Sequence, residues 1–320
     1  MEYRRLGGAG MVSSAVGLGC LGFTGAYGRA DRARSMLAVR AALDVGITML
    51  AMADFYQAGS VEQLVGEALA GWRSRMLIAT QGGQRFTDSG RLTGFDASPA
   101  YLRRACDASL RRLRADRLDL YFLARPDDEI PIEDSIGALA ELVAEGKVGG
   151  IGLGDVSAGT LRRAHAVHPV TAVAAEYSLW HRRPEQKILP ALRELAVGFV
   201  ACRPLGRGVL AGQVTSAGQL PAGDVRRLDR RFREAGLARI RPQLRAAQEM
   251  AALHNVGVGR LALAWLLAQD ERIVAVPGTR SSLHVEMNAA AASVSISPED
   301  CRRLGALFAP RPAPARRQRR

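Results

Sequence analysis

The chain has 320 residues, of which 48% are hydrophobic and 23% are charged, values that are ordinary for a globular protein. No run of about 18 apolar residues occurs, which excludes a membrane span, and residues 1–5 do not resemble a secretory signal, so we expect a cytoplasmic protein. The net charge of +13 comes mostly from dispersed arginines and a basic C-terminal segment, without a nucleic-acid-binding motif, so a nucleic acid is not an expected partner.

The first half of the chain alternates short apolar runs with amphipathic helical stretches. The apolar runs predict strands over residues 15–19, 47–50, 76–80 and 118–123. The amphipathic stretches predict helices over residues 32–44, 61–69, 99–113 and 132–145. Ser98 and Pro99 suit the cap and first turn of the third helix, and Gly46 and Gly146 suit positions just after two helix ends.

The second half of the chain continues the same alternation. Its apolar runs predict strands over residues 149–153, 170–175, 199–202 and 273–276. Its amphipathic stretches predict helices over residues 157–166, 188–195, 242–254, 261–269 and 298–307. Residues 205–241 are rich in glycine and are predicted to form one large loop after the seventh strand.

Eight short strands that alternate with helices, and that are apolar on both faces, indicate a parallel sheet covered by helices. Right-handed connections make closure into a barrel the economical topology. We therefore predict a single-domain (β/α)8 TIM barrel of the α/β class over residues 1–308, with an N-terminal hairpin and C-terminal rim loops. Residues 309–320 are predicted to be a basic disordered tail.

Cysteine and histidine usage argues against a metal site. Cys20, Cys106, Cys202 and Cys301 lie far apart, and none belongs to a CxxC pair. Zinc knuckles and redox pairs both need closely spaced cysteines, so neither is expected. The five histidines are also scattered, and we predict no metal.

A set of short segments is similar to bacterial aldo-keto reductases. The matching segments are residues 3–7, 12–20, 42–47, 119–121, 142–148, 151–153, 176–180, 204–208, 262–267 and 276–280. The resemblance runs from residue 2 to residue 306, in order and at the family's spacing. It implies reduction of carbonyl compounds with NADPH, in which a tyrosine hydroxyl protonates the developing alkoxide with help from aspartate, lysine and histidine.

The four positions that the resemblance makes catalytic can be compared residue by residue. Tyr56 stands at the catalytic tyrosine and is retained. Ala51 stands in place of the aspartate, Gln81 in place of the lysine and Ala124 in place of the histidine. None of these three replacements can carry a proton or a charge at neutral pH. The resemblance therefore predicts a catalytic centre that has lost three of its four groups.

The expected nicotinamide pocket is altered as well. Gly154 replaces a serine and Ala174 a glutamine that bind the carboxamide in the family. Cys202 replaces the tyrosine on which nicotinamide stacks, and Arg203 replaces a serine near the pyrophosphate. Arg203 could instead hold a carboxylate, an enolate or a phosphate.

The expected adenine end of the cofactor site is better preserved. The residues implied to bind the cofactor there are Arg207, Gly208, Gly278, Thr279, Arg280, His284, Glu286 and Asn288. His284 stands where an arginine often binds the 2′-phosphate, and histidine is a weaker, pH-dependent partner for an anion. Binding of NADP(H) and absence of any cofactor both stay open.

Three functions are compatible with this pattern. The first is a repurposed enzyme that uses Tyr56 and Arg203 for non-redox chemistry on a small molecule, such as dehydration, cyclisation or epimerisation, a role suited to natural-product biosynthesis. The second is a divergent NADP(H)-dependent oxidoreductase that reduces a carbonyl. The preserved residues at the adenine end of the cofactor site favour this alternative. The third is a non-catalytic binding protein. The sequence predicts neither the substrate nor the oligomeric state.

Overall fold

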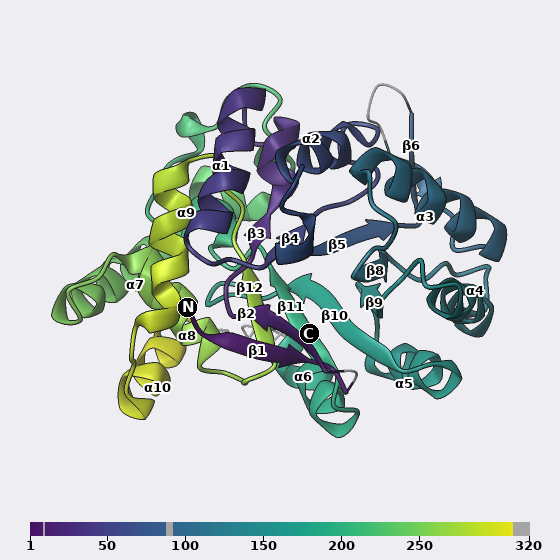
Figure 1. Ribbon diagram of the computed structural model, residues 1–320. Helices are drawn as coiled ribbons and strands as arrows, with labels where there is room; N and C mark the ends of the chain where they lie inside the picture. The colour runs from purple at the N-terminus through teal and green to yellow at the C-terminus, as the bar shows by residue number, and fades with distance from the viewer. Residues whose placement is uncertain (9, 88–91, 310–320) are drawn as a thin grey trace, which may run out of the picture.

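The computed structural model describes residues 1–8, 10–87 and 92–309 (Figure 1). Nearly all of the predicted basic tail lies outside the described residues. Over the described part of the chain, no single helix is both long and apolar enough to cross a membrane. Helices α7 (Glu234–Leu253) and α8 (Val258–Leu267) pass that test only as a pair, across a bend of 88°.

Eight parallel strands form the central sheet, in the order β12-β11-β10-β9-β8-β5-β4-β3. Their bounds are β3 (Leu18–Gly19), β4 (Met49–Ala51), β5 (Leu77–Gly82), β8 (Leu120–Leu123), β9 (Ile151–Gly154), β10 (Val170–Glu176), β11 (Gly198–Cys202) and β12 (Ile273–Val276). The two edges meet, because Val16 pairs with Ala275 and Gly19 pairs with Gly278, both in parallel. The predicted (β/α)8 barrel is therefore confirmed.

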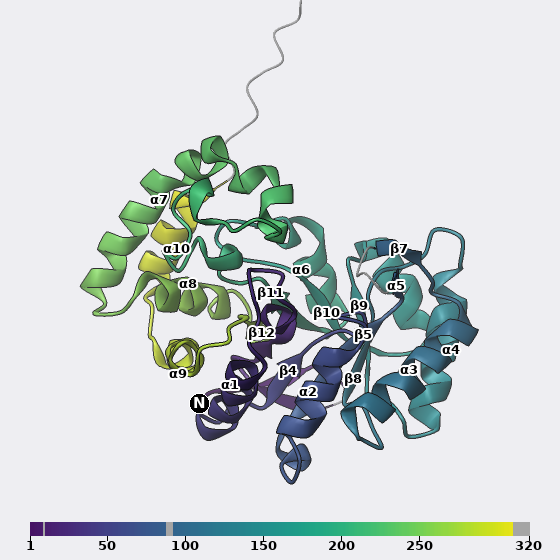
Figure 2. The same cartoon turned by 90° about the horizontal axis from the view of Figure 1, so that it is seen from above.

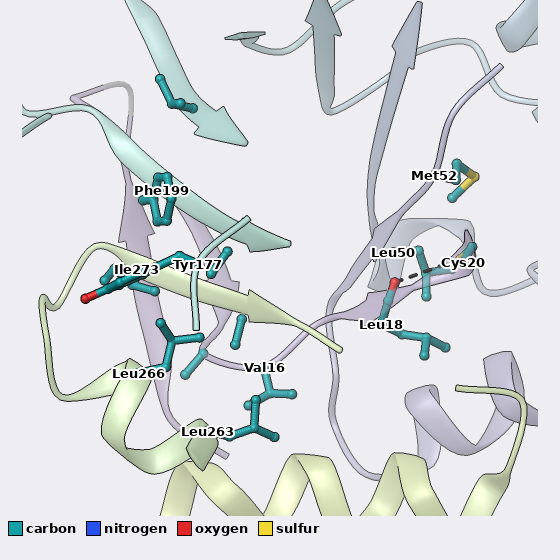
Figure 3. Close-up of a cluster of buried hydrophobic side chains, with 14 of the residues drawn as sticks. Val16, Leu18, Cys20, Leu50, Met52, Tyr177, Phe199, Leu263, Leu266 and Ile273 are labelled. Carbon is teal, nitrogen blue, oxygen red and sulfur yellow. Dashed lines mark hydrogen bonds between the residues drawn. The ribbon is translucent and has the colours of Figure 1, made fainter. Parts of the chain in front are cut away.

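Helices surround this barrel on its outside (Figure 2). Besides α7 and α8 they are α1 (Arg32–Asp44), α2 (Ser60–Ala68), α3 (Pro99–Leu113), α4 (Ile132–Ala144), α5 (Ala158–Val167), α6 (Pro184–Glu194), α9 (Ser282–Ala289) and α10 (Pro298–Leu307). Their apolar faces pack on the outward-facing strand residues. Figure 3 shows part of this layer, where Leu263 and Leu266 of α8 lie near Val16 and Ile273.

The N-terminal hairpin covers the amino-terminal end of the barrel. Strands β1 (Tyr3–Leu6) and β2 (Met11–Ser14) pair in antiparallel fashion. Leu6 is fully buried and packs against the inward-facing residues of the barrel strands, which include Leu120 and Val200. The Arg4 guanidinium donates hydrogen bonds of 2.9–3.0 Å to the carbonyl oxygens of Leu267, Asp270 and Ile273. This end of the barrel is therefore filled by side chains.

The structure corrects the prediction in the second half of the chain. The loop predicted over residues 205–241 ends eight residues earlier, because α7 begins at Glu234 and contains Pro242 in its interior. Leu237, Ile240 and Leu244 are buried on one face of α7, and their packing outweighs the hydrogen bond that a proline removes. Helix α9 and the hairpin of β6 (Gln84–Phe86) and β7 (Leu92–Phe95) were not predicted.

Candidate active site

A cavity of about 1010 Å³ opens at the carboxyl ends of the barrel strands. It extends outward to α1, where Leu37 lines it, and to α9, where Met287 lines it. The loop after β11 closes one side with Leu205 and Ala211. In barrels of this class the carboxyl ends of the strands carry the active site, and this volume suits a small molecule or a cofactor.

The four positions predicted to be catalytic all line this cavity. Ala51 ends β4, Gln81 lies in β5, and Ala124 directly follows β8, so each faces the mouth of the barrel together with Tyr56. No lysine lines the cavity in the described part of the chain. Ala51, Gln81 and Ala124 thus lie at the strand mouths, and among the described residues no lysine from another element reaches the cavity.

The floor of the cavity is made of small and apolar side chains. Gly154, Ala174 and Cys202, the positions that the sequence analysis assigned to the nicotinamide pocket, lie there beside Phe122. A Cβ atom on Gly154 would lie 2.4 Å from the carbonyl oxygen of Ala124, which is much closer than van der Waals contact. A serine therefore does not fit at position 154 unless the backbone moves.

Tyr56 lines the cavity with a phenol whose acidity depends on its surroundings. Burial raises its pKa well above the ordinary value, and the neighbouring Cys202 raises it further. The Arg203 charge lowers the pKa in part, without reversing the shift. The Tyr56 hydroxyl is consequently neutral over the physiological range and can act as a hydrogen-bond donor.

Arg203 belongs to a cluster of arginines around one carboxylate. Its Nη1 atom lies 3.3 Å from Oε2 of Glu176, whereas Arg231 Nη1 lies 2.7 Å from Oε1 and Arg207 Nη2 lies 3.6 Å from Oε2. Burial opposes ionisation of Glu176, but the Arg231 hydrogen bond and the arginine charges outweigh it and lower the carboxyl's pKa. Glu176 is therefore an anion that holds cations at the cavity wall.

The lining of the cavity is rich in positive charge. Seven arginines line the whole cavity, against three acidic residues: Arg29, Arg34, Arg203, Arg207, Arg226, Arg260 and Arg280, against Asp31, Asp155 and Glu176. The buried Nε atoms of Arg207 and Arg260 have no hydrogen-bond partner within the described residues. Unpaired buried donors of this kind favour an anionic ligand such as a phosphate.

The structure brings together most of the predicted adenine-end residues. Those that line the cavity are Arg207, Gly208, Gly278, Thr279, Arg280, His284 and Asn288. Glu286 does not line it and is exposed on α9. At about 100° per residue, positions 284 and 288 share one face of α9 whereas position 286 lies on the opposite side. Arg207 and Arg280 bring positive charge to this end, whereas Gly154 and Ala174 have no polar side-chain atoms.

Sequence reasoning missed several residues that shape the site. Tyr27 lines the cavity, and the Arg226 guanidinium stacks 4.8 Å from its ring centroid. Arg231 reaches Glu176 from a loop 55 residues further along the chain. No local motif marks these residues, because only the folded barrel brings their loops to the same rim. Within the described residues, no cluster of three or more metal-ligating side chains occurs.

Known proteins of one family are similar to this chain over nearly its whole length. The profile of the Aldo/keto reductase family matches residues 15–308. The chain belongs to the aldo/keto reductase family. A probable aldo-keto reductase 1 from Glycine max is 38% identical over 305 residues, covering 94% of this chain and 87% of the relative.

Solved aldo-keto reductase structures share the fold. The glycerol dehydrogenase of Gluconobacter oxydans has a TM-score of 0.90, with 26% identity and 98% of both chains covered. An aldo/keto reductase from Klebsiella pneumoniae in complex with NADP and acetate has a TM-score of 0.76, with 28% identity and 97% of both chains covered. The chain thus shares the aldo-keto reductase fold over nearly its whole length.

Asp54 lies next to the site, outside the residues that line the cavity. Its backbone N–H donates to the carbonyl oxygen of Gln81 at 3.0 Å, and its Oδ1 atom is buried without a partner in the described structure. The pKa of Asp54 is raised to about 7, chiefly by burial and then by the charge of Glu62, while Arg112 offsets part of the shift. The folded protein therefore holds a proton here that the unfolded chain releases near pH 4.

We expect the Asp54→Asn variant to lose less stability than the parent protein as pH rises. Between about pH 4 and pH 7 the folded state binds one proton more than the unfolded state at Asp54, so raising the pH weakens the fold. The free energy of unfolding, measured with urea at about pH 5 and pH 8, should fall between these pH values in both proteins. The fall should be roughly 2–3 kcal/mol larger in the parent protein than in Asp54→Asn. Identical losses in both proteins would mean that Asp54 titrates normally.

Proposed function

We propose that this aldo/keto reductase family protein is an enzyme that performs non-redox proton-transfer chemistry on a carbonyl-containing small molecule. The observation that carries the proposal is the set of residues at the strand mouths. Ala51, Gln81 and Ala124 all line the cavity, and none can relay a proton to or from Tyr56. A positioned acid–base group contributes about 10²–10⁴-fold to a rate, so ordinary carbonyl reduction would lack most of its catalysis.

The remaining groups suit stabilisation of an oxyanion. The neutral Tyr56 hydroxyl can donate a hydrogen bond to a substrate carbonyl, and this bond strengthens as an enolate develops. The Arg203 charge lies close enough to Tyr56 to affect its pKa, and so supports the same developing charge. A carboxylate must also accept the substrate proton. Glu176 is paired with three arginines, so we assign this role to Asp155, which lines the cavity near Cys202.

A divergent NADP(H)-dependent oxidoreductase is the second candidate. The unpaired Nε atoms of Arg207 and Arg260 and the preserved adenine-end residues favour it, and relatives from Klebsiella pneumoniae bind NADP or NADPH. A bound NADPH would supply a hydride. Arg207, Arg280 and His284 would then hold its anionic end, while Cys202 would lie where the family stacks the nicotinamide.

We expect the Tyr56→Phe variant to lose about tenfold or more of the catalysed rate, because one positioned hydrogen-bond donor is removed. The measurement is incorporation of solvent deuterium next to the carbonyl of enolisable ketones and oxo acids, without any cofactor, followed by mass spectrometry. Tyr3→Phe is the control, because Tyr3 is 55% exposed and belongs to the hairpin at the opposite end. Exchange that is equally fast in both variants would remove Tyr56 from the mechanism.

A further inference from the structure

The cavity floor provides room for an apolar group. At the ends of the strands, this floor is formed by four small residues, Ala51, Ala124, Gly154 and Ala174. Phe122, Val200 and Val276 complete this part of the lining with apolar side chains. Burial of the hydrocarbon part of a ligand against this floor would stabilise the complex, because apolar surface leaves water. The floor offers a ligand few hydrogen-bond partners.

A cation stands at the side of this floor. Arg203 follows β11, which lies four strands from β5 in either direction around the closed barrel, so the positive charge is opposite the Gln81 position. The Arg203 backbone has φ of +51°, an uncommon conformation for a residue other than glycine. Its side chain lines the cavity and is 43% exposed. The Arg203 guanidinium is thus available to a ligand that enters the mouth.

The charge balance of the cluster leaves Arg203 in excess. Arg207 and Arg231 each contact both Glu176 and Asp229, which gives two cations for two carboxylates. Arg203 adds a third cation, and its hydrogen bond to Glu176 is long, at 3.3 Å. Within the described structure this is the one hydrogen bond of its guanidinium. Most of its five N–H donors are therefore left for a ligand.

We propose that the substrate is a small organic acid with an apolar body, whose carboxylate is bound by Arg203 and whose body covers the alanine and glycine floor. This inference rests on the proposed function, because it puts the substrate at Tyr56 in the place that nicotinamide would otherwise occupy. Arginine matches the planar carboxylate with paired hydrogen bonds. Glu176 is then a positioning residue, since it holds the arginine cluster at the cavity wall.

A phosphate of a dinucleotide could satisfy the same guanidinium, and a binding experiment separates the two sources. The probes are 3-phenylpropanoate, its neutral amide, and adenosine 2′,5′-bisphosphate, each titrated by calorimetry into the full-length protein. We expect the carboxylate to bind about tenfold more tightly than the amide. Arg203→Gln should remove that difference by weakening the carboxylate alone, and Arg203→Lys should retain part of it.

Arg280→Gln is the matched control, because Arg280 lines the same cavity near α9. It should weaken adenosine 2′,5′-bisphosphate and leave 3-phenylpropanoate unchanged, the reverse of Arg203→Gln. The inference is overturned if the carboxylate and amide bind equally, if neither binds, or if Arg203→Gln weakens only the bisphosphate. These titrations involve no turnover, so a carboxylate site can stand even if the protein later proves to oxidise NADPH.

Discussion

We expect the triple variant Ala51→Asp, Gln81→Lys and Ala124→His to be a poor carbonyl reductase, although it introduces the acid–base groups that the family resemblance implies. Adding Cys202→Tyr and Ala174→Gln should then raise NADPH-dependent reduction by about 10²–10⁴-fold over the triple variant. The reason is geometric, because hydride transfer needs a nicotinamide held in attack position before a proton relay can contribute. The measurement is kcat/KM for NADPH oxidation with a panel of aldehydes.

The double variant Cys202→Tyr and Ala174→Gln is the control, since it rebuilds the ring contacts without the relay. Gly154 is left unchanged in every variant, because a Cβ there would collide with the Ala124 carbonyl oxygen at 2.4 Å. Substantial reductase activity in the triple variant alone would contradict the account, since it would mean that the nicotinamide already binds productively over Cys202.

Arg112→Met should destabilise the protein by roughly 3–5 kcal/mol, because it leaves a buried carboxylate without its charged partner. Glu62 of α2 has no exposed surface. Its Oε2 atom accepts a hydrogen bond from Arg112 Nε at 2.7 Å and lies 2.6 Å from Arg112 Nη2 in the ion pair. The Glu62 Oε1 atom accepts a hydrogen bond from Thr80 of β5 at 2.7 Å, so the Glu62–Arg112 ion pair joins α2 and α3 to the strand that carries Gln81. Urea unfolding at neutral pH measures the loss.

Arg162→Met is the matched control for this prediction. Arg162 also makes a two-point ion pair, with Nε–Oε1 and Nη2–Oε2 distances to Glu194 of 3.0 and 2.6 Å, but both side chains are about half exposed. Exposed pairs contribute about 0–1 kcal/mol, so this variant should be nearly as stable as the parent. Equal losses in the two variants would mean that burial of Glu62 does not set the cost.

The parts of the fold that the sequence predicted well are those with strong local signals. Helix α3 runs from Pro99 to Leu113 as expected, because Ser98 caps it and proline suits its first turn. Helix α9 was missed, because it is short and buries only Val285 and Ala289, which leaves a weak apolar pattern. The start of α7 was predicted at residue 242, eight residues too late, because the buried face of the helix keeps Pro242 in its interior.

The site was predictable where the family resemblance fixes a position at a strand end. Ala51, Gln81 and Ala124 could be assigned to the cavity, because parallel strands bring their carboxyl ends to one mouth. The partners of Arg203 could not be predicted, since Glu176 and Arg231 meet only across the folded rim. The sequence therefore identified the residues at the strand ends more readily than the contacts that surround them.

We propose that the barrel mouth does not support hydride transfer. The most direct measurement is a titration of the unmodified protein with NADPH, followed by nicotinamide fluorescence and then by oxidation after a carbonyl panel is added. The account predicts either no binding, or binding through the phosphate end with no carbonyl-dependent oxidation. Micromolar binding of NADPH with oxidation that depends on the carbonyl and proceeds at the rate of an ordinary reductase would contradict it.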